Sequence, residues 1–256
     1  FLRQLTQLPQ DLRAPPQGPQ VHDTSGVQFY FVLADKIRGC NENFQMPRMQ
    51  ELQRDWLIPM SIEFMRGYRG DYRKDFCTVS HRWETPDQPD STGEQLVALR
   101  AFLRKNPQIR YVWYDYWCMP QAPRSPQEDA EFKIMLREVN LLYLSTQVLI
   151  LMDMSYMSRF WTNFEAYLAM QTASEDGLKF ATRIADRRFT ITCIHTATTY
   201  SESELTKMWS HKTPQEAYET LQKPDITVTN MRDKEEQLEK LLHLNEEVRQ
   251  RLLRQL

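Results

Sequence analysis

Glycine and cysteine are both scarce in this sequence, and neither forms a recognisable motif. The 256 residues include seven glycines and four cysteines. No GxGxxG or P-loop pattern occurs, so a bound nucleotide would not be held by a usual Rossmann or Walker loop. The cysteines Cys40, Cys77, Cys118 and Cys193 form no CxxC pair, which excludes the common zinc spacings and a disulfide framework. We therefore expect reduced thiols, no metal site and an intracellular protein, cytoplasmic or organellar.

Long hydrophobic runs are absent as well. No apolar run approaches the ~20 residues that a helix needs to span a bilayer. The longest apolar stretch, residues 141–154, is interrupted by Ser145, Thr146 and Gln147. This stretch predicts the end of a helix followed by a buried strand, and we expect no membrane span.

The chain also lacks an excess of charge of either sign. Its formal net charge is −2, which gives no general attraction for nucleic acid or anionic lipid. We therefore expect nucleic acid not to be a partner. HExxH and GxSxG motifs do not occur. The first residue is Phe1 rather than Met, which predicts a processed or truncated N-terminus from which any targeting segment would be missing.

Short apolar stretches alternate with helical patterns through the middle of the chain. Hydrophobic residues make up 41% and charged residues 26% of the sequence, which is typical of a globular protein with a packed core. Strands separated by helices of about ten or more residues predict an α/β fold with a parallel sheet wrapped by right-handed crossovers. The four strands are expected at residues 76–80, 109–114, 147–152 and 189–194.

Two earlier segments carry weaker patterns. Residues 28–34 are expected as a short strand or an extended segment. Apolar residues recur roughly at helical spacing across residues 49–65, which predicts a helix that Pro59 breaks.

The composition changes at both ends of the chain. Residues 1–26 are rich in Gln and Pro without an apolar period, which predicts an extended arm. Residues 27–195 would form the α/β domain, and residues 196–256 a helical C-terminal extension. The last helix of this extension is amphipathic. It either packs on the domain, which we favour, or docks with a partner helix. The three helices of the extension are expected at residues 201–209, 213–221 and 233–256.

Polar side chains follow the predicted strands where each strand ends. Ser80, His81 and Arg82 end the first strand, Asp115 follows the second, and Asp153 follows the third. The carboxyl ends of parallel strands meet at one edge of a sheet, so these residues predict one site. Arg82 suits bidentate phosphate binding. Asp115 could orient a ligand hydroxyl or the backbone of the loop after it. An alternative for His81 is a hydrogen-bonded histidine that anchors the following loop, and the residues leave this choice open.

A tryptophan and a glutamate lie four residues apart in the next predicted helix, which runs over about 158–172. On a helix, Trp161 and Glu165 share one face, so an indole lies beside a carboxylate. A partly desolvated carboxylate can stabilise an oxocarbenium-like centre or hold a ribose hydroxyl, and an indole can cover a pyridinium ring. The alternative is that Trp161 belongs to the core and Glu165 is a solvated partner of an arginine.

Three stretches in a fixed order resemble the TIR superfamily. TIR domains have a strand that ends in Ser-His, as at Ser80 and His81. They continue with a strand that has an acidic end, a variable loop and a third apolar strand. A Ser-x-x-Trp-x-x-x-Glu motif opens the next helix, and Ser158, Trp161 and Glu165 match it position by position.

The chain is especially similar to the heterokaryon-incompatibility (HET) branch of that superfamily. The similar stretches are residues 112–121, with the sequence VWYDYWCMPQ, residues 138–151, and residues 159–165, with the sequence RFWTNFE. The resemblance covers residues 74–175, under half the chain. This sequence departs from the usual TIR pattern at Arg82-Trp83. It also departs from the HET pattern at Phe164, a position where HET domains often have Gln.

The resemblance implies a flavodoxin-like sheet and NAD as substrate rather than as cofactor. Glu165 would be the catalytic residue of an NAD glycohydrolase that cleaves the nicotinamide–ribose bond. Trp161 would form a wall for the ring, and Ser80, His81, Arg82 and Ser158 would contact ribose or phosphate. Asp115 would orient these groups.

Many TIR-like domains are instead non-catalytic adaptors that self-associate. The alternative function is therefore an interaction or assembly module, whose terminal arms and TIR-like surface bind other proteins. The Gln- and Pro-rich arm and the charged last helix favour this alternative, because a minimal catalytic domain needs neither.

Overall fold

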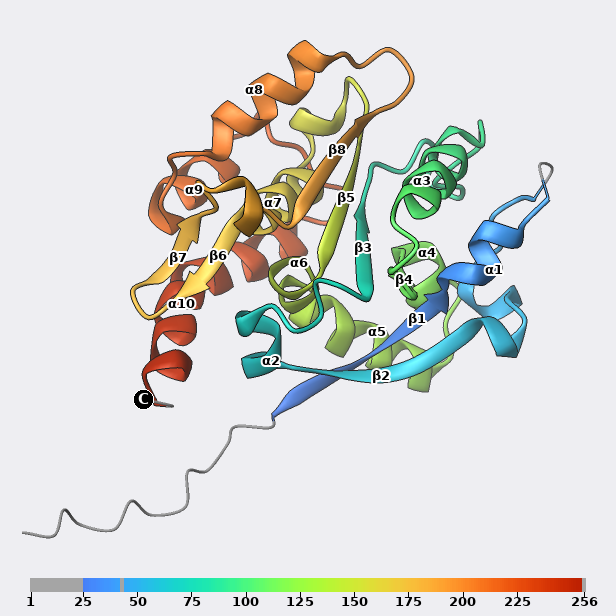
Figure 1. Cartoon of the computed structure of the whole chain (residues 1–256), viewed down its shortest axis with the longest axis horizontal. Coiled ribbons are helices and arrows are strands. Elements are labelled where there is room, and N and C mark those ends of the chain that lie inside the picture. The colour runs from blue at the N-terminus through green and yellow to red at the C-terminus, as the bar shows by residue number, and fades with distance from the viewer. Residues whose placement is uncertain (1–24, 42–43, 255–256) are drawn as a thin grey trace, which may run out of the picture.

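The computed structural model describes residues 25–41 and 44–254. Its main sheet has six strands in the order β2-β1-β4-β3-β5-β8, and a separate two-stranded sheet pairs β6 with β7 (Figure 1). Of the arm expected at residues 1–26, all but the last two residues lie outside the described residues. The strands are β1 (Gly26–Leu33), β2 (Leu57–Glu63), β3 (Phe76–Ser80), β4 (Tyr111–Trp113), β5 (Gln147–Met152), β6 (Gln171–Ser174), β7 (Gly177–Phe180) and β8 (Phe189–Cys193).

The four strands expected from the sequence form the parallel part of the sheet. β4 and β5 both pair in parallel with β3, and β8 pairs in parallel with β5. All residues of β3 and nearly all of β5 are buried, as expected for central strands covered on both faces. The chain passes from β3 to β4 on one side and returns to β5 on the other, so the strand order reverses at β3. This arrangement is compatible with a flavodoxin-like fold.

The prediction of a helix across residues 49–65 is wrong. That segment forms two 3-10 turns, η1 (Met49–Glu51) and η2 (Arg54–Trp56), and then strand β2. β2 pairs antiparallel with β1, and β1 pairs antiparallel with β4, so the sheet is mixed rather than wholly parallel. Pro59 is tolerated because β2 is the outermost strand, where a missing N–H interrupts no inner ladder. The strand expected near residues 28–34 is confirmed as β1.

Helices cover both faces of the sheet. The crossovers β3–β4 and β4–β5 run in opposite directions, and right-handed crossovers therefore place α3 on one face and α5, α6 and α7 on the other. Ser125 and Glu128 form a capping box at the start of α5, with Pro126 as its first residue. The elements in this part of the chain are α1 (Ala34–Gly39), α2 (Phe64–Arg69), α3 (Glu94–Lys105), α4 (Asp115–Cys118), α5 (Pro126–Glu138), α6 (Asn140–Ser145), η3 (Tyr156–Ser158), α7 (Phe160–Ala169) and η4 (Ile184–Asp186).

The three helices expected after residue 195 are confirmed as α8 (Thr199–Trp209), α9 (Pro214–Leu221) and α10 (Met231–Leu253). α10 packs against α9 and runs behind the β6–β7 hairpin (Figure 1). The sequence patterns did not predict this hairpin. Leu241, Leu244 and Val248 of α10 are fully buried and belong to the same apolar cluster as the residues of β3 and β5. The apolar face of α10 is thus packed within the chain.

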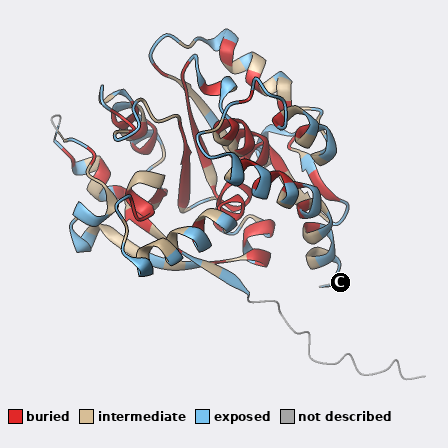
Figure 2. Ribbon diagram, turned by 180° about the vertical axis from the view of Figure 1, so that it is seen from behind, coloured by how far each residue is buried: buried red, intermediate tan, exposed pale blue. Residues whose placement is uncertain are grey.

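Buried residues concentrate in the central strands and in the helix faces turned toward them, whereas the outer helix faces are exposed (Figure 2). No helix among the described residues is both long enough and apolar enough to cross a membrane.

Candidate functional site

A cavity of about 640 Å³ lies at the carboxyl ends of β3 and β4, beside the point where the strand order reverses. This volume falls within the ~300–1,000 Å³ range of small-molecule sites. Its walls come from the segment after β3, the loop before α5, one face of α5 and the start of α7. Thr229, Asn230 and Asp233 add a wall from the start of α10. The site therefore draws on segments as far apart in the sequence as His81 and Asp233.

Glu165 lines this cavity from the second turn of α7 and does not form a salt bridge with any described residue. Its Oε2 accepts a hydrogen bond from Ser80 Oγ at 2.6 Å, and Ser80 Oγ is also hydrogen-bonded to the hydroxyl of Tyr156. The hydroxyl of Tyr143 also lies beside the carboxyl group, and it donates to the carbonyl oxygen of Val79 at 3.4 Å. Hydroxyls from β3, α6 and η3 thus surround Glu165, and no guanidinium or ammonium group of the described residues pairs with it.

Burial raises the pKa of Glu165 to about 8. The hydrogen bonds from Ser80 and Tyr143 oppose this shift because they stabilise the ionised form, and the charge of Asp115 adds to it. The residue keeps some contact with the cavity, although the carboxyl group itself is closely surrounded by protein. Glu165 is therefore an acid that a cationic ligand would help to ionise.

Trp161 lies one turn before Glu165 on the same helix and also lines the cavity. Its indole packs edge-on against the rings of Phe160 and Phe164 at centroid distances of 5.6 and 6.1 Å. The start of α7 is held by Thr227, whose backbone exchanges hydrogen bonds with Ser158 and Phe160. The indole therefore joins the core along one edge and is half-buried at the cavity wall.

Ser158 is the expected site residue that the structure keeps apart from the others. Its side chain is exposed, and its hydroxyl donates to the carbonyl oxygen of Ser155 at 2.8 Å. It shapes the turn that leads into α7 and does not line the cavity.

His81 is held on both ring nitrogens. Nε2 lies 2.9 Å from Asp115 Oδ1, and Nδ1 lies 3.2 Å from the hydroxyl of Tyr114, whose ring stacks on the imidazole. Gln95 donates from its amide nitrogen to two carbonyl oxygens, so its Oε1 must accept from Tyr114. The Tyr114 hydroxyl can then accept from His81, and both ring nitrogens of His81 have protein partners. This geometry favours the anchoring alternative for His81, because no donor remains for a ligand.

Asp115 is similarly occupied at the start of α4. Its Oδ1 accepts from His81 and from the backbone N–H of Tyr116, and its Oδ2 accepts from Trp83 Nε1 at 2.7 Å. The carboxylate fixes the segment after β3 against the end of β4. Asp115 is thus placed as an orienting residue.

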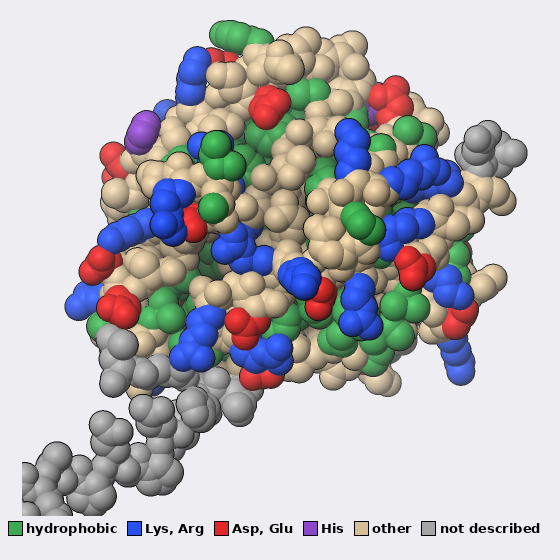
Figure 3. Space-filling view, viewed as in Figure 1, with side chains coloured by type: hydrophobic (Ala, Val, Ile, Leu, Met, Phe, Trp, Pro, Cys, Tyr) green, Lys and Arg blue, Asp and Glu red, His purple; other side chains and the backbone are tan. Residues whose placement is uncertain are grey.

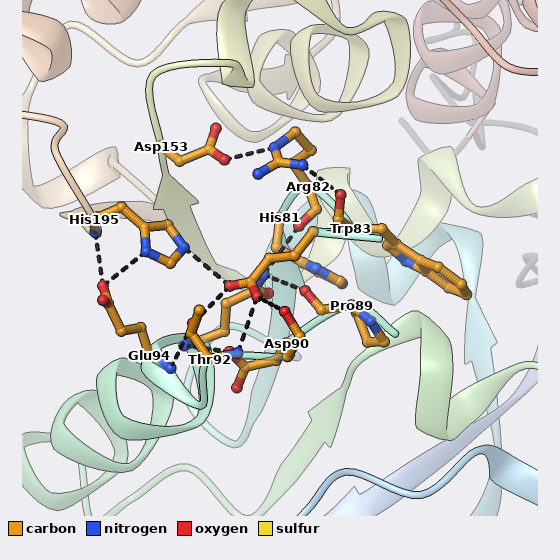
Figure 4. Close-up of polar contacts among 12 residues, drawn as sticks. His81, Arg82, Trp83, Pro89, Asp90, Thr92, Glu94, Asp153 and His195 are labelled. Carbon is orange, nitrogen blue, oxygen red and sulfur yellow. Dashed lines mark hydrogen bonds and ion pairs between the residues drawn. The ribbon is translucent and has the colours of Figure 1, made fainter. Parts of the chain in front are cut away.

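Arg82 bridges the ends of β3 and β5. Its Nε donates to Asp153 Oδ2 at 2.5 Å, and its Nη1 donates to the carbonyl oxygen of Trp83 (Figure 4). The remaining nitrogen, Nη2, has no partner among the described residues, and Arg82 lines the cavity. This guanidinium can still offer donors to an anion.

A second cluster, which the sequence patterns did not indicate, borders the cavity at Glu84. His195, from the loop after β8, lies between Glu84 and Glu94, with its Nε2 2.9 Å from Glu84 Oε1 and its Nδ1 3.1 Å from Glu94 Oε2 (Figure 4). Glu84 also accepts from Ser91 and Thr92, and these hydrogen bonds and the nearby imidazole outweigh burial and lower its pKa. The φ of His195 is 52°, a left-handed conformation that non-glycine residues seldom adopt. The cluster ties the loop after β8 to the loop before α3.

Two arginines at the cavity were also missing from the expected site. Arg124 lies in the Pro-rich loop before α5 with its guanidinium 3.5 Å from the ring centroid of Phe132. The side chain of Arg159 is exposed and has no ion-pair partner among the described residues. The sequence did offer one signal for Arg124. Its Pro-rich loop follows the second predicted parallel strand, and ligands bind at the carboxyl edge of such sheets.

The arrangement combines a cation-accepting end with an anion-accepting end. Glu165 and Trp161 suit a cationic aromatic ring and the sugar attached to it, and Arg82, Arg124 and Arg159 suit phosphate groups. Among the described residues, no three His, Cys, Asp or Glu side chains are placed to hold a metal ion. The residues that are present therefore fit a ligand that carries both a positive ring and a phosphate.

Comparisons of the chain with known protein families, with curated proteins and with solved structures found no match.

Proposed function

We propose that this chain is a TIR-like domain whose cavity cleaves the nicotinamide–ribose bond of NAD. The observation that carries the proposal is the carboxyl group of Glu165. It lines the cavity, accepts a hydrogen bond from the Ser80 hydroxyl, has no cationic partner among the described residues, and lies one helical turn from the indole of Trp161. Because this carboxylate has no cationic partner in the protein, a cationic substrate could supply the positive charge that stabilises its ionised form.

The reaction requires a negative charge where positive charge develops. Trp161 would cover the pyridinium ring, and the ionised Glu165 would lie near the ribose carbon bonded to the ring nitrogen. When that C–N bond breaks, its electron pair leaves with nicotinamide, which becomes neutral. The ribose carbon takes on oxocarbenium character until water adds to it and loses a proton. Glu165 would stabilise this transition state more than the ground state.

The other end of the cavity would hold the diphosphate. The uncommitted nitrogen of Arg82 and the guanidinium groups of Arg124 and Arg159 are the candidates. The hydrogen bond between His81 and Asp115 would keep the segment after β3 in place, and neither residue would touch the substrate.

The test is release of nicotinamide from NAD by the purified full chain at high protein concentration. The Glu165→Gln variant removes the charge and keeps the size, and we expect it to lower the rate by about 100-fold or more. Glu219→Gln is the matched control, because Glu219 is exposed on α9 and lies outside the cavity. Equal turnover by the two variants, or no turnover by the unchanged protein, would contradict the proposal.

The alternative, a non-catalytic assembly module, loses part of its support in this structure. The apolar face of α10 is packed in the core of its own chain, so that face is not available to a partner. Residues 1–24 of the N-terminal arm lie outside the described residues. Self-association through the arm or another surface would appear as a concentration-dependent mass in sedimentation, whether or not NAD is cleaved.

A further inference from the structure

A second pocket lies at the opposite end of the sheet from the proposed active site. It has a volume of about 230 Å³ and is bordered by the end of α2, the start of β6 and the segments that precede β3 and β8. Three arginines line it, namely Arg69, Arg73 and Arg188. On the molecular face that contains α2, Lys and Arg side chains lie interspersed with Asp and Glu side chains (Figure 3).

Arg188 is a buried cation without a carboxylate partner among the described residues. Only 3% of its surface is exposed. Its Nη1 donates to the carbonyl oxygens of Tyr143 and Thr146, and its Nη2 donates to those of Leu168 and Gln171. These carbonyls lie at the ends of α6 and α7, where the helix dipoles carry partial negative charge. They satisfy four donors but provide no full negative charge, and the fifth donor, Nε–H, has no partner among the described residues.

The charge of Arg73 lies close enough to disfavour the charge of Arg188. Burial lowers the pKa of Arg188 to about 9, and repulsion by Arg73 adds to that shift. Among the described residues Arg73 donates once, from Nη2 to the carbonyl oxygen of Ala185 at 3.0 Å, so the rest of its guanidinium is open to a ligand. Two like charges beside one pocket are stable together only if a negative charge joins them or solvent screens them.

The acidic side chain at this pocket offsets only part of the positive charge, since its charge also acts on Arg73. Of the described residues that line it, only Asp186 is acidic. Both oxygens of Asp186 accept hydrogen bonds from Arg183, at 2.6 Å from Nε and 2.9 Å from Nη2, so the same carboxylate is shared between two arginines. The pocket therefore keeps an excess of positive charge.

We propose that this pocket binds a phosphate or diphosphate group through Arg73 and the Nε–H of Arg188. Guanidinium groups favour such oxyanions because their planar donors match two phosphate oxygens. The bound anion would also join α2 to the segment that precedes β8, because Arg73 follows α2 and Arg188 precedes β8. This site is separate from the proposed active site and does not depend on NAD cleavage.

The probe is inorganic pyrophosphate, and its affinity for the full chain is measured by titration calorimetry. Because the arginines of the active-site cavity could also bind pyrophosphate, the titration is repeated in the Arg124→Gln variant. Arg73→Gln is the test substitution, since Arg73 is partly exposed and its removal leaves the buried bonds of Arg188 in place. Arg187→Gln is the matched control, because Arg187 is exposed on the same segment but does not line the pocket.

We expect Arg73→Gln to weaken pyrophosphate binding by about tenfold or more, the usual effect of losing a charged hydrogen-bond donor. The Arg187→Gln and Arg124→Gln variants should still bind pyrophosphate at this pocket. Absence of binding to the unchanged protein would overturn the proposal. Loss of binding in Arg124→Gln, or an equal affinity in Arg73→Gln and Arg187→Gln, would overturn it as well.

Discussion

Glu165 shows how one residue can couple a site to pH. Its folded-state pKa of about 8 lies above the ordinary value of 4.5 because burial disfavours the ionised form. Between these two pH values the folded protein keeps a proton that the unfolded chain has released. The contribution of Glu165 to the free energy of unfolding should therefore fall as pH rises from about 4.5 to 8.

Glu165→Gln removes that dependence. We expect the variant to be more stable than the unchanged protein at pH 8 to 9, by more than the roughly 1.4 kcal/mol that corresponds to one pKa unit. The difference should shrink toward pH 4, where the glutamate is protonated in both states. Denaturant unfolding of both proteins across this pH range gives the measurement. A constant difference at all pH values would show that Glu165 is not a buried acid.

The same pKa determines how the proposed activity depends on pH. Only the ionised carboxylate can stabilise an oxocarbenium-like centre, and kcat/KM reports the ionisation of the free enzyme. We expect kcat/KM for NAD to rise with pH and to level off above about 8. A profile that falls over pH 6 to 9 would contradict the role assigned to Glu165.

At the scale of elements, the contact between α2 and α6 depends on a glycine. A Cβ atom added at Gly67 would lie 2.2 Å from Ser145 Oγ and 3.0 Å from Ser145 Cβ. Ser145 is fully buried at the end of α6, so the two helices would have to separate. The absence of a side chain at Gly67 thus permits the close packing of two short helices.

Gly67→Ala should therefore lower the free energy of unfolding by about 1–3 kcal/mol, as overpacking commonly does. Gly39→Ala is the control, because a Cβ atom at Gly39 meets no atom within 4 Å. The control should be neutral or slightly stabilising, since alanine restricts the unfolded chain. Chemical denaturation of both variants measures the difference, and equal stabilities would mean that α2 and α6 are not closely packed.

At the scale of the whole molecule, α10 completes both the core and the cavity. Leu238, Leu241, Leu244 and Val248 are buried against the rest of the chain, while Asn230 and Asp233 line the cavity at the start of the helix. Each buried aliphatic side chain contributes about 1.5–3 kcal/mol. Together they approach the total stability of a typical domain.

A chain that ends at residue 230 should therefore fail to unfold cooperatively, or should have a much lower melting temperature than the full chain. Circular dichroism during thermal unfolding tests this expectation. A soluble truncated protein with an unchanged melting temperature would mean that α10 is a separable extension. Deletion of this helix is for the same reason a poor test of partner binding, because the core would not stay intact.

Patterns that depend on neighbouring residues were readable from the sequence. The buried strands around residues 76–80 and 147–152 and the three C-terminal helices follow from local apolar spacing, and the structure contains all of them. The apolar spacing across residues 49–65 pointed to a helix, whereas β2 forms there because β1 offers a strand with which it pairs. Pairing between distant strands leaves little trace in either sequence alone.

By itself the sequence determined the four parallel strands, the position of polar residues at their carboxyl ends and the shared helix face of Trp161 and Glu165. Only the tertiary structure decided which of these residues meet. It placed Ser80 and Tyr143 against Glu165, committed both nitrogens of His81 to Asp115 and Tyr114, and left Ser158 outside the cavity. The physical reason is that hydrogen bonds and desolvation depend on atoms brought together from distant segments, which local spacing does not encode.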